Sequence, residues 1–132
     1  MEKEKYKYEL DFKVRDYECD LQGVVNNSVY QNYLEHTRHE YLLSKGHDFS
    51  KMFDEGITGV VTRIEIDYKS PLKSGDAFLS NLNVEKEGRY KIIFYQDLYN
   101  KKDNRLVIKA KVTTACFKNG RPVVPENFEG LL

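Results

Sequence analysis

The stretch from Val14 to Arg38 reads VRDYECDLQGVVNNSVYQNYLEHTR, and it contains a long loop followed by the start of a long helix. Residues 16–25 show no regular alternation of apolar and polar side chains, and they include Gly23. We therefore expect a loop of about ten residues here, which is longer than most connections in small domains. Binding and catalytic residues are often carried on such loops, so this segment is the first candidate for a site.

The helix predicted after this loop begins at an asparagine cap and ends at a glycine. Asn26 or Asn27 can accept a hydrogen bond from the first helical turn, and Gly46 is typical of a helix end. Between them apolar positions recur at spacings of three and four, namely Val29, Tyr30, Tyr33, Leu34, Thr37, Tyr41 and Leu42. This pattern predicts about eighteen residues of helix, or about 27 Å, with one face turned to a core.

Strands are predicted on both sides of the loop and helix. Residues 6–15 read YKYELDFKVR and place apolar side chains on one parity, which is typical of a half-buried strand. Phe49, Met52 and Phe53 are expected to form a short helical turn after the long helix. The alternation then recurs in segments separated by short polar turns, at 57–70, 77–87, 90–99 and 105–117.

This order of elements predicts an α+β fold in a single domain over residues 1–132. Strands joined by short turns form antiparallel sheets, and an isolated amphipathic helix must bury its apolar face against that sheet. A chain of 132 residues supports one compact core more readily than two. We therefore expect a five-stranded antiparallel sheet with one long helix packed against it.

Composition and charge disfavour several classes of function. The chain has 21 basic and 21 acidic residues, so its formal net charge is zero and no single-sign surface is predicted to bind nucleic acid. No apolar run is long enough for a membrane span or a signal peptide, so a cytoplasmic protein is expected. Cys19 and Cys116 are too few for a disulfide framework, and both are expected to be reduced thiols.

The loop and helix together resemble the signature of the 4-hydroxybenzoyl-CoA thioesterase-like branch of the hotdog superfamily. In that signature an Asp, here Asp20, is followed by a Gly and a hydrophobic pair, which begins here after Gly23. The helix then opens with a Tyr and carries Glu-x-x-Arg, here Tyr30 and residues 35–38. Residues 61–76, VTRIEIDYKSPLKSGD, are similar to the family's second strand and its turn, so the resemblance covers nearly the whole chain.

The resemblance implies a hotdog fold, in which the five-stranded antiparallel sheet wraps around one long central helix. It also implies the hydrolysis of an acyl-CoA or acyl-carrier-protein thioester. Asp20 would be the catalytic nucleophile or general base, and the backbone N–H of Asn27 would polarise the thioester carbonyl. The first turn of a helix suits that second role, because its N–H groups lack intrahelical partners and lie at the positive end of the helix dipole. Residues expected to bind the substrate around these two are Gly23, Val25, Asn26 and Tyr30. Glu35 is the alternative base, because related hotdog enzymes place a carboxylate on this helix.

Two plainer interpretations apply to the loop residues. Asp20 is of a residue type that is common in turns, so it could serve only to cap the loop. Cys19 could be a nucleophile, but the motif places no His to activate it. We expect Cys19 to pack against the loop instead.

The helix carries further titratable side chains that have a structural interpretation. Glu35, Arg38 and His39 lie at helical spacings of three and four, which predicts a surface or interface ion pair. His36, His39 and Glu40 could hold a metal ion, but two or three ligands on one open face make a weak site. We therefore predict no metal, and no organic cofactor either, because a thioester is reactive enough for a carboxylate and an oxyanion donor.

Three functions compete on this fold. Thioester hydrolysis is preferred because Asp20 lies in the expected loop, and the alternative is a non-catalytic acyl-thioester-binding hotdog module. A hotdog dehydratase needs a His paired with a carboxylate at positions that this sequence does not fill. We also expect a homodimer or a dimer of dimers, because a single copy would leave the sheet edges and an apolar flank uncovered.

Overall fold

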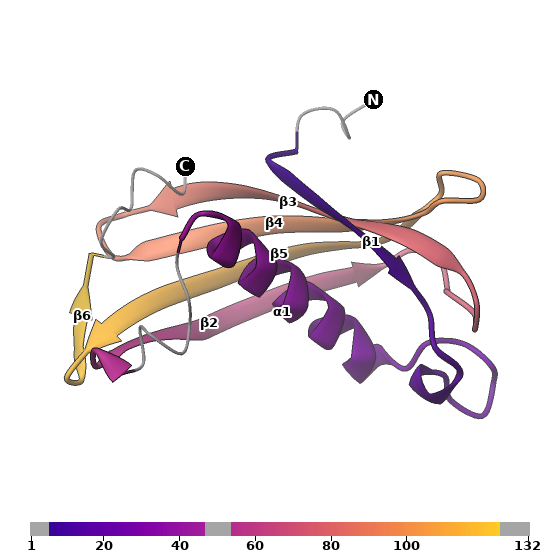
Figure 1. Ribbon diagram of the computed structural model, residues 1–132, viewed down its shortest axis with the longest axis horizontal. Coiled ribbons are helices and arrows are strands. Elements are labelled where there is room, and N and C mark those ends of the chain that lie inside the picture. Colours follow the sequence, from indigo (N-terminus) through magenta and orange to yellow (C-terminus); the bar gives the residue numbers. More distant parts are fainter. Residues whose placement is uncertain (1–5, 47–53, 125–132) are drawn as a thin grey trace.

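An antiparallel sheet curves around one long helix in the computed structural model of the chain, which describes residues 6–46 and 54–124 (Figure 1). The helix lies across the concave face of the sheet, and the order of the expected elements is confirmed. The elements in chain order are β1 (Tyr8–Lys13), the 3-10 turn η2 (Asp16–Glu18), α1 (Asn27–Ser44), β2 (Ile57–Tyr68), β3 (Ala77–Glu87), β4 (Lys91–Asn100), β5 (Leu106–Lys118) and β6 (Arg121–Val123).

The sheet has the strand order β1-β3-β4-β5-β2, with β6 paired to β5. The predicted strand ends agree with the structure to within two residues. The expected count of five strands was one short, because the three residues of β6 are too few to show an alternation. The helical turn expected around Phe49, Met52 and Phe53 lies outside the described residues.

The bounds of α1 follow from local chemistry. The side-chain oxygen of Asn26 accepts a 2.9 Å hydrogen bond from the backbone N–H of Ser28, so Asn26 is the N-cap. At the other end Gly46 has a φ of +87°, a conformation that glycine adopts without strain and that commonly follows a helix. The buried face of the helix consists of Tyr30, Tyr33, Leu34, Thr37, Arg38 and Tyr41.

The core beneath the N-terminal half of α1 is rich in aromatic side chains. The ring of Tyr33 lies 4.8 Å from that of Phe78 in β3 and 5.4 Å from that of Phe12 in β1, measured between centroids. Val14 and Val25, which flank the loop before the helix, belong to the same buried cluster. The loop is therefore anchored at both ends in the core, while residues 15–17 and 20–23 are exposed.

The two outer strands of the sheet differ in length and exposure. β1 has 6 residues, whereas β2 has 12 and forms the other edge. Val60 and Val61 on β2 are each 43% exposed, and Tyr68 at its end is 48% exposed. A long edge strand with exposed apolar side chains is a template for pairing with another strand.

None of the helices in the described part of the chain has the length and apolar character needed to span a membrane.

Candidate active site

The loop that contains Asp20 is a tight hairpin. Cys19 and Val25 face each other as a bridge, and the backbone N–H of Asp20 donates a 2.9 Å hydrogen bond to the carbonyl of Val24. The N–H of Gly23 donates back to the carbonyl of Asp20 at 2.9 Å, and Gly23 has a φ of +81°. A β-turn followed by a left-handed residue is a common way to close a three-residue hairpin, and it favours glycine at this position.

This hairpin is attached to the turn between β2 and β3. The N–H of Val25 donates a 2.9 Å hydrogen bond to the carbonyl of Leu72, and Val24 forms a bridge with Lys73. Leu72 itself is fully buried in the core. The two segments that carry the family-like sequence, residues 14–38 and 61–76, therefore meet at one end of the sheet.

Asp20 lies at the exposed edge of the hairpin. One of its carboxylate oxygens, Oδ1, accepts a 2.8 Å hydrogen bond from the N–H of Gln22. This contact is the loop-capping role that a turn aspartate can play, and it uses only one side of the carboxylate. The adjacent Leu21 is 107% exposed and Tyr17 of η2 is 77% exposed, so two apolar side chains of this segment lie on the surface.

The start of α1 offers a hydrogen-bond donor beside this loop. The N–H of Ser28 bonds to the side chain of Asn26, and the N–H of Val29 bonds to the Asn26 carbonyl. The N–H of Asn27, the first helical residue, forms no hydrogen bond within residues 6–46 and 54–124. It is an N–H donor at the positive end of the helix, where an oxyanion would be stabilised.

The other predicted substrate-binding residues have structural roles. Val25 and Tyr30 are buried, and the ring of Tyr30 lies 5.6 Å from that of Tyr68 and 6.1 Å from that of Tyr33. Burial is the main cause that raises the pKa of Tyr30 above its ordinary value. Tyr30 therefore forms part of the floor under the loop, while Asn26 caps the helix.

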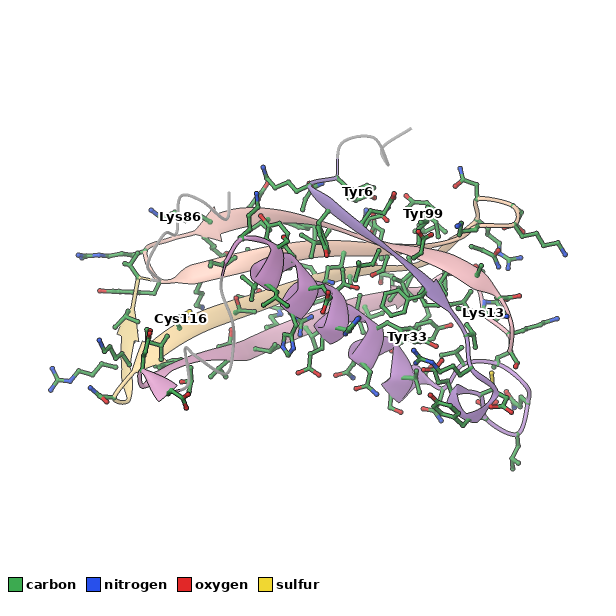
Figure 2. All side chains as sticks on the ribbon, viewed as in Figure 1. Tyr6, Lys13, Tyr33, Lys86, Tyr99 and Cys116 are labelled. Atoms are coloured by element: carbon green, nitrogen blue, oxygen red, sulfur yellow. The ribbon has the colours of Figure 1, made fainter. Side chains whose placement is uncertain are left out.

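A buried carboxylate near the site was missed in the sequence. Glu18 is 8% exposed, and its Oε1 accepts a 2.7 Å hydrogen bond from the hydroxyl of Tyr33. Figure 2 shows Tyr33 at the end of the molecule that carries the loop. Arg15 donates two more bonds to the same carboxylate, at 2.9 Å from its backbone N–H and at 2.8 Å from Nη1. The three-residue spacing of Arg15 and Glu18 was the one feature of the sequence that could have indicated this ion pair. Tyr33 was interpreted from the sequence only as an apolar-face residue of the helix.

Burial and hydrogen bonding act in opposite directions on Glu18. Burial raises the pKa of its carboxyl group, whereas the bonds from Arg15 and Tyr33 lower it by more, so the net pKa lies below the ordinary value. For the Tyr33 hydroxyl, burial and the hydrogen bond to Glu18 act in the same direction, and both raise its pKa. Glu18 is thus held as a carboxylate and Tyr33 as a neutral donor.

The predicted ion pair on the helix is only partly right. Glu35 Oε2 and His39 Nε2 lie 3.9 Å apart on the surface, as expected. The expectation for Arg38 was wrong, because its side chain turns inward, is 8% exposed and bonds to Gln96. The described residues contain no group of three His, Cys, Asp or Glu side chains placed to hold a metal.

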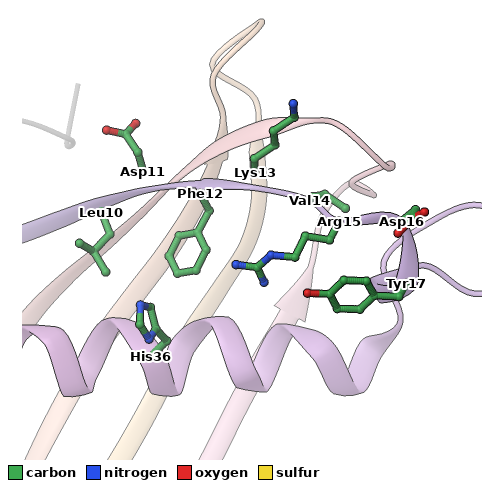
Figure 3. Close-up of a pocket in the computed structure, with 9 residues that line it drawn as sticks. All are labelled: Leu10, Asp11, Phe12, Lys13, Val14, Arg15, Asp16, Tyr17 and His36. Carbon is green, nitrogen blue, oxygen red and sulfur yellow. The ribbon is translucent and has the colours of Figure 1, made fainter.

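A groove of about 610 Å³ runs between β1 and α1, on the side of the helix away from β2 (Figure 3). The rings of Phe12 and His36 line it and contact each other edge to face, with centroids 5.7 Å apart, and Arg15 and Tyr17 close the end near η2. No residue predicted for the site appears among the described residues that line it. Asp20 therefore lies outside this groove, on the exposed loop.

Residues 14–129 match the family model described as the Thioesterase-like superfamily, which covers the loop, the helix and strands β2 to β6. The chain belongs to this superfamily. The match confirms the resemblance to hotdog thioesterases that the loop and helix indicated. The same stretch includes Asp20 and Asn27, but the match assigns no role to either residue.

Relatives and structural neighbours of this thioesterase-like chain agree with the family. A putative esterase of Aquifex aeolicus is 38% identical over 111 residues, which are 84% of this chain and 85% of that protein. A chloroplastic acyl-acyl carrier protein thioesterase of Arabidopsis thaliana, ATL3, is 34% identical over 117 residues. These are 88% of this chain, which spans only 62% of the plant protein's length.

A solved structure shows the same fold. A 1,4-dihydroxy-2-naphthoyl-CoA thioesterase from Synechocystis superposes with a TM-score of 0.89, covering 94% of this chain and 93% of that one. The sequence identity is 16%, so this likeness concerns the fold alone. The hotdog architecture expected from the sequence is thereby confirmed.

Proposed function

We propose that this chain hydrolyses an acyl thioester of coenzyme A or of acyl-carrier protein to a free acid and a thiol. The observation that carries the proposal is that one anchored segment holds both an exposed carboxylate and a helix-start N–H that has no hydrogen-bond acceptor in the described part of the chain. Asp20 lies in the hairpin that leads directly into the helix start at Asn27. The hairpin is held to the core by the hydrogen bond from the N–H of Val25 to the carbonyl of buried Leu72. Membership of a superfamily that includes named thioesterases supports the same reaction.

The chemistry needs one carboxylate, one donor and one water. Asp20 either attacks the thioester carbonyl carbon, giving an anhydride that water then hydrolyses, or removes a proton from a water that attacks directly. In both routes the carbonyl oxygen becomes an oxyanion, which the N–H of Asn27 and the helix dipole stabilise. The carbon–sulfur bond breaks, and the departing sulfur leaves as a thiol after it takes a proton.

The surroundings of Asp20 suit a substrate that approaches closely. Gly23 has no side chain at the tip of the hairpin, and no atom lies within 4 Å of the position that a Cβ would take. Val25, Asn26 and Tyr30 shape the base of the loop, and we propose that they bind the substrate mainly through that shape. Glu35, exposed on the next turns of the helix, is the alternative base.

The proposed enzyme acts as a homodimer, or as a dimer of dimers. Asp20 is exposed on the surface of a single copy, and the exposed apolar side chains of Leu21 and Tyr17 in the same segment need a cover. The exposed β2 edge can form the dimer interface, because the β2 strands of two copies can pair antiparallel about a two-fold axis. That pairing would bring the start of the partner's β2 toward Tyr68, at the end of the sheet where the Asp20 loop lies.

Thiol release from a panel of thioesters tests the proposed function. The full chain is assayed with acyl-CoA substrates of different length and aromaticity and with acylated carrier protein, beside Asp20→Asn as the matched control. We expect hydrolysis by the parent protein and its loss in the variant. Binding of these thioesters without hydrolysis by the parent would instead identify a non-catalytic acyl-thioester-binding module. If the parent protein neither binds nor hydrolyses any of these thioesters, both the enzyme and the binding-module hypotheses are rejected.

A further inference from the structure

We infer that Glu18, held by Tyr33, is a positioning residue that fixes the Asp20 hairpin against the start of α1. The inference rests on the proposed function, because it assigns the reaction to Asp20 and Asn27. It concerns a buried side chain that the proposed chemistry itself does not use.

Glu18 connects the segments that must be aligned. Its carboxylate accepts hydrogen bonds from the hydroxyl of Tyr33, in the second turn of α1, and from Arg15, just after β1. Its backbone carbonyl accepts a 3.1 Å hydrogen bond from the N–H of Asn26, the helix cap. Asp20 follows Glu18 by two residues, and Asn27 follows Asn26 directly. One residue is thus bonded to both sides of the proposed site.

Glu18 does not act as a second base in this arrangement. Both of its carboxylate oxygens accept bonds from Tyr33 or Arg15, and the side chain is buried. A buried carboxylate is stable only when donors replace its lost water, and charge-assisted bonds of this kind are short and strong. The same bonds restrict how the hairpin can move relative to the helix.

Alignment of this kind affects rate more than binding. A displacement of about 1 Å between a catalytic group and its target can lower a rate by about 100-fold. Loss of the Tyr33–Glu18 bond would let the hairpin shift while the aromatic core under α1 stays in place, since the Tyr33 ring packs on Phe12 and Phe78. A purely structural carboxylate would instead lower stability and leave the rate of folded enzyme unchanged.

The test is a double-mutant cycle on kcat, measured well below the melting temperature of each variant. Tyr33→Phe, Glu18→Gln and the double variant are compared with the parent for kcat, KM and Tm. We expect each single change to lower kcat by about 10- to 100-fold with KM changed by less than about 3-fold. The double variant should fall no further than the more impaired single variant, because Tyr33→Phe removes the donor of the Tyr33–Glu18 bond and Glu18→Gln removes the charge of its acceptor.

Tyr41→Phe is the matched control, because it removes the hydroxyl of another buried tyrosine nearer the C-terminal end of the same helix. Its kcat should stay at the parental value. Parental kcat in Tyr33→Phe, or full additivity in the double variant, would overturn the inference while leaving hydrolysis by Asp20 intact. If Glu18→Gln does not fold, Tyr33→Phe with its Tyr41→Phe control decides the question alone.

Discussion

Arg38 in α1 donates a 3.0 Å hydrogen bond from Nη1 to the side-chain oxygen of Gln96 in β4. Gln96 in turn donates a 3.0 Å bond from Nε2 to the carbonyl of Leu34 on the helix. Both side chains are buried, and burial lowers the pKa of Arg38 to about 10 although Glu35 acts in the opposite direction. The middle of the helix is thus joined to the sheet by a polar contact that contains a buried positive charge.

Arg38→Met should lower the free energy of unfolding by about 1–3 kcal/mol, because the buried oxygen of Gln96 loses its donor. Removal of a buried charge offsets part of this loss. Chemical denaturation measures the change. Arg38→Met with Gln96→Met should be more stable than the sum of the two single changes predicts, since neither polar group is then left unpaired. Additive losses would show that the contact is not a coupled pair.

Asp20→Asn should lower kcat by about 10²–10⁴-fold, because an amide can neither attack as an anion nor take a proton from water. Asn keeps an oxygen that can accept the bond from Gln22, so Tm should change little. Steady-state kinetics and thermal melting are compared with those of Glu35→Gln. Should Asp20→Asn keep near-parental kcat while Glu35→Gln is inactive, Glu35 is the base.

Gly23→Ala and Gly46→Ala should destabilise the protein by similar amounts but differ in activity. Both glycines have a positive φ, +81° for Gly23 and +87° for Gly46. An added Cβ would meet no neighbouring atom within 4 Å at either position. The expected cost is therefore backbone strain alone, about 1–2 kcal/mol at each. Only Gly23 shapes the proposed site. Gly23→Ala should therefore lower kcat, and Gly46→Ala should not; equal kcat values in the two variants would argue against a role for the hairpin.

The parent protein should be at least a dimer by light scattering at its working concentration. Val60→Lys with Val61→Lys places charges on the exposed β2 edge and should give an inactive monomer, because edge lysines oppose strand pairing. Glu9→Lys on β1, the opposite edge, is the control and should leave the assembly unchanged. An active monomeric parent would contradict the proposed assembly.

Acid should destabilise the parent more than Glu18→Gln. The pKa of Glu18 in the folded state lies below the ordinary value of 4.5, so the folded protein binds this proton more weakly than the unfolded chain does. The stabilisation is therefore complete above that value and is lost as pH falls through the folded pKa. Urea unfolding at about pH 6 and about pH 3.5 measures the difference, which should be smaller in Glu18→Gln. Equal losses would show that Glu18 is not responsible.

Features that depend on neighbours along the chain could be predicted from the sequence. The Asn26 cap and Gly46 bound the long helix because capping and positive φ are local properties. The strands were predicted from period-two alternation, which indicates that one face of a strand is buried and does not depend on which element packs against that face. The hairpin around Asp20 and Gly23 is also closed by bonds within a few residues, although only a loop was predicted there from the sequence.

Contacts between distant segments were decided only by the tertiary structure. Sequence spacing placed Arg38 beside Glu35 on the helix, yet packing turned it toward Gln96, 58 positions away. The helical position of Tyr33 predicted a core residue. That position does not reveal that the Tyr33 hydroxyl donates a hydrogen bond to the carboxylate of Glu18. The physical reason is that a periodic pattern reports which face of an element is buried, whereas the partner of each buried polar atom depends on how the elements pack.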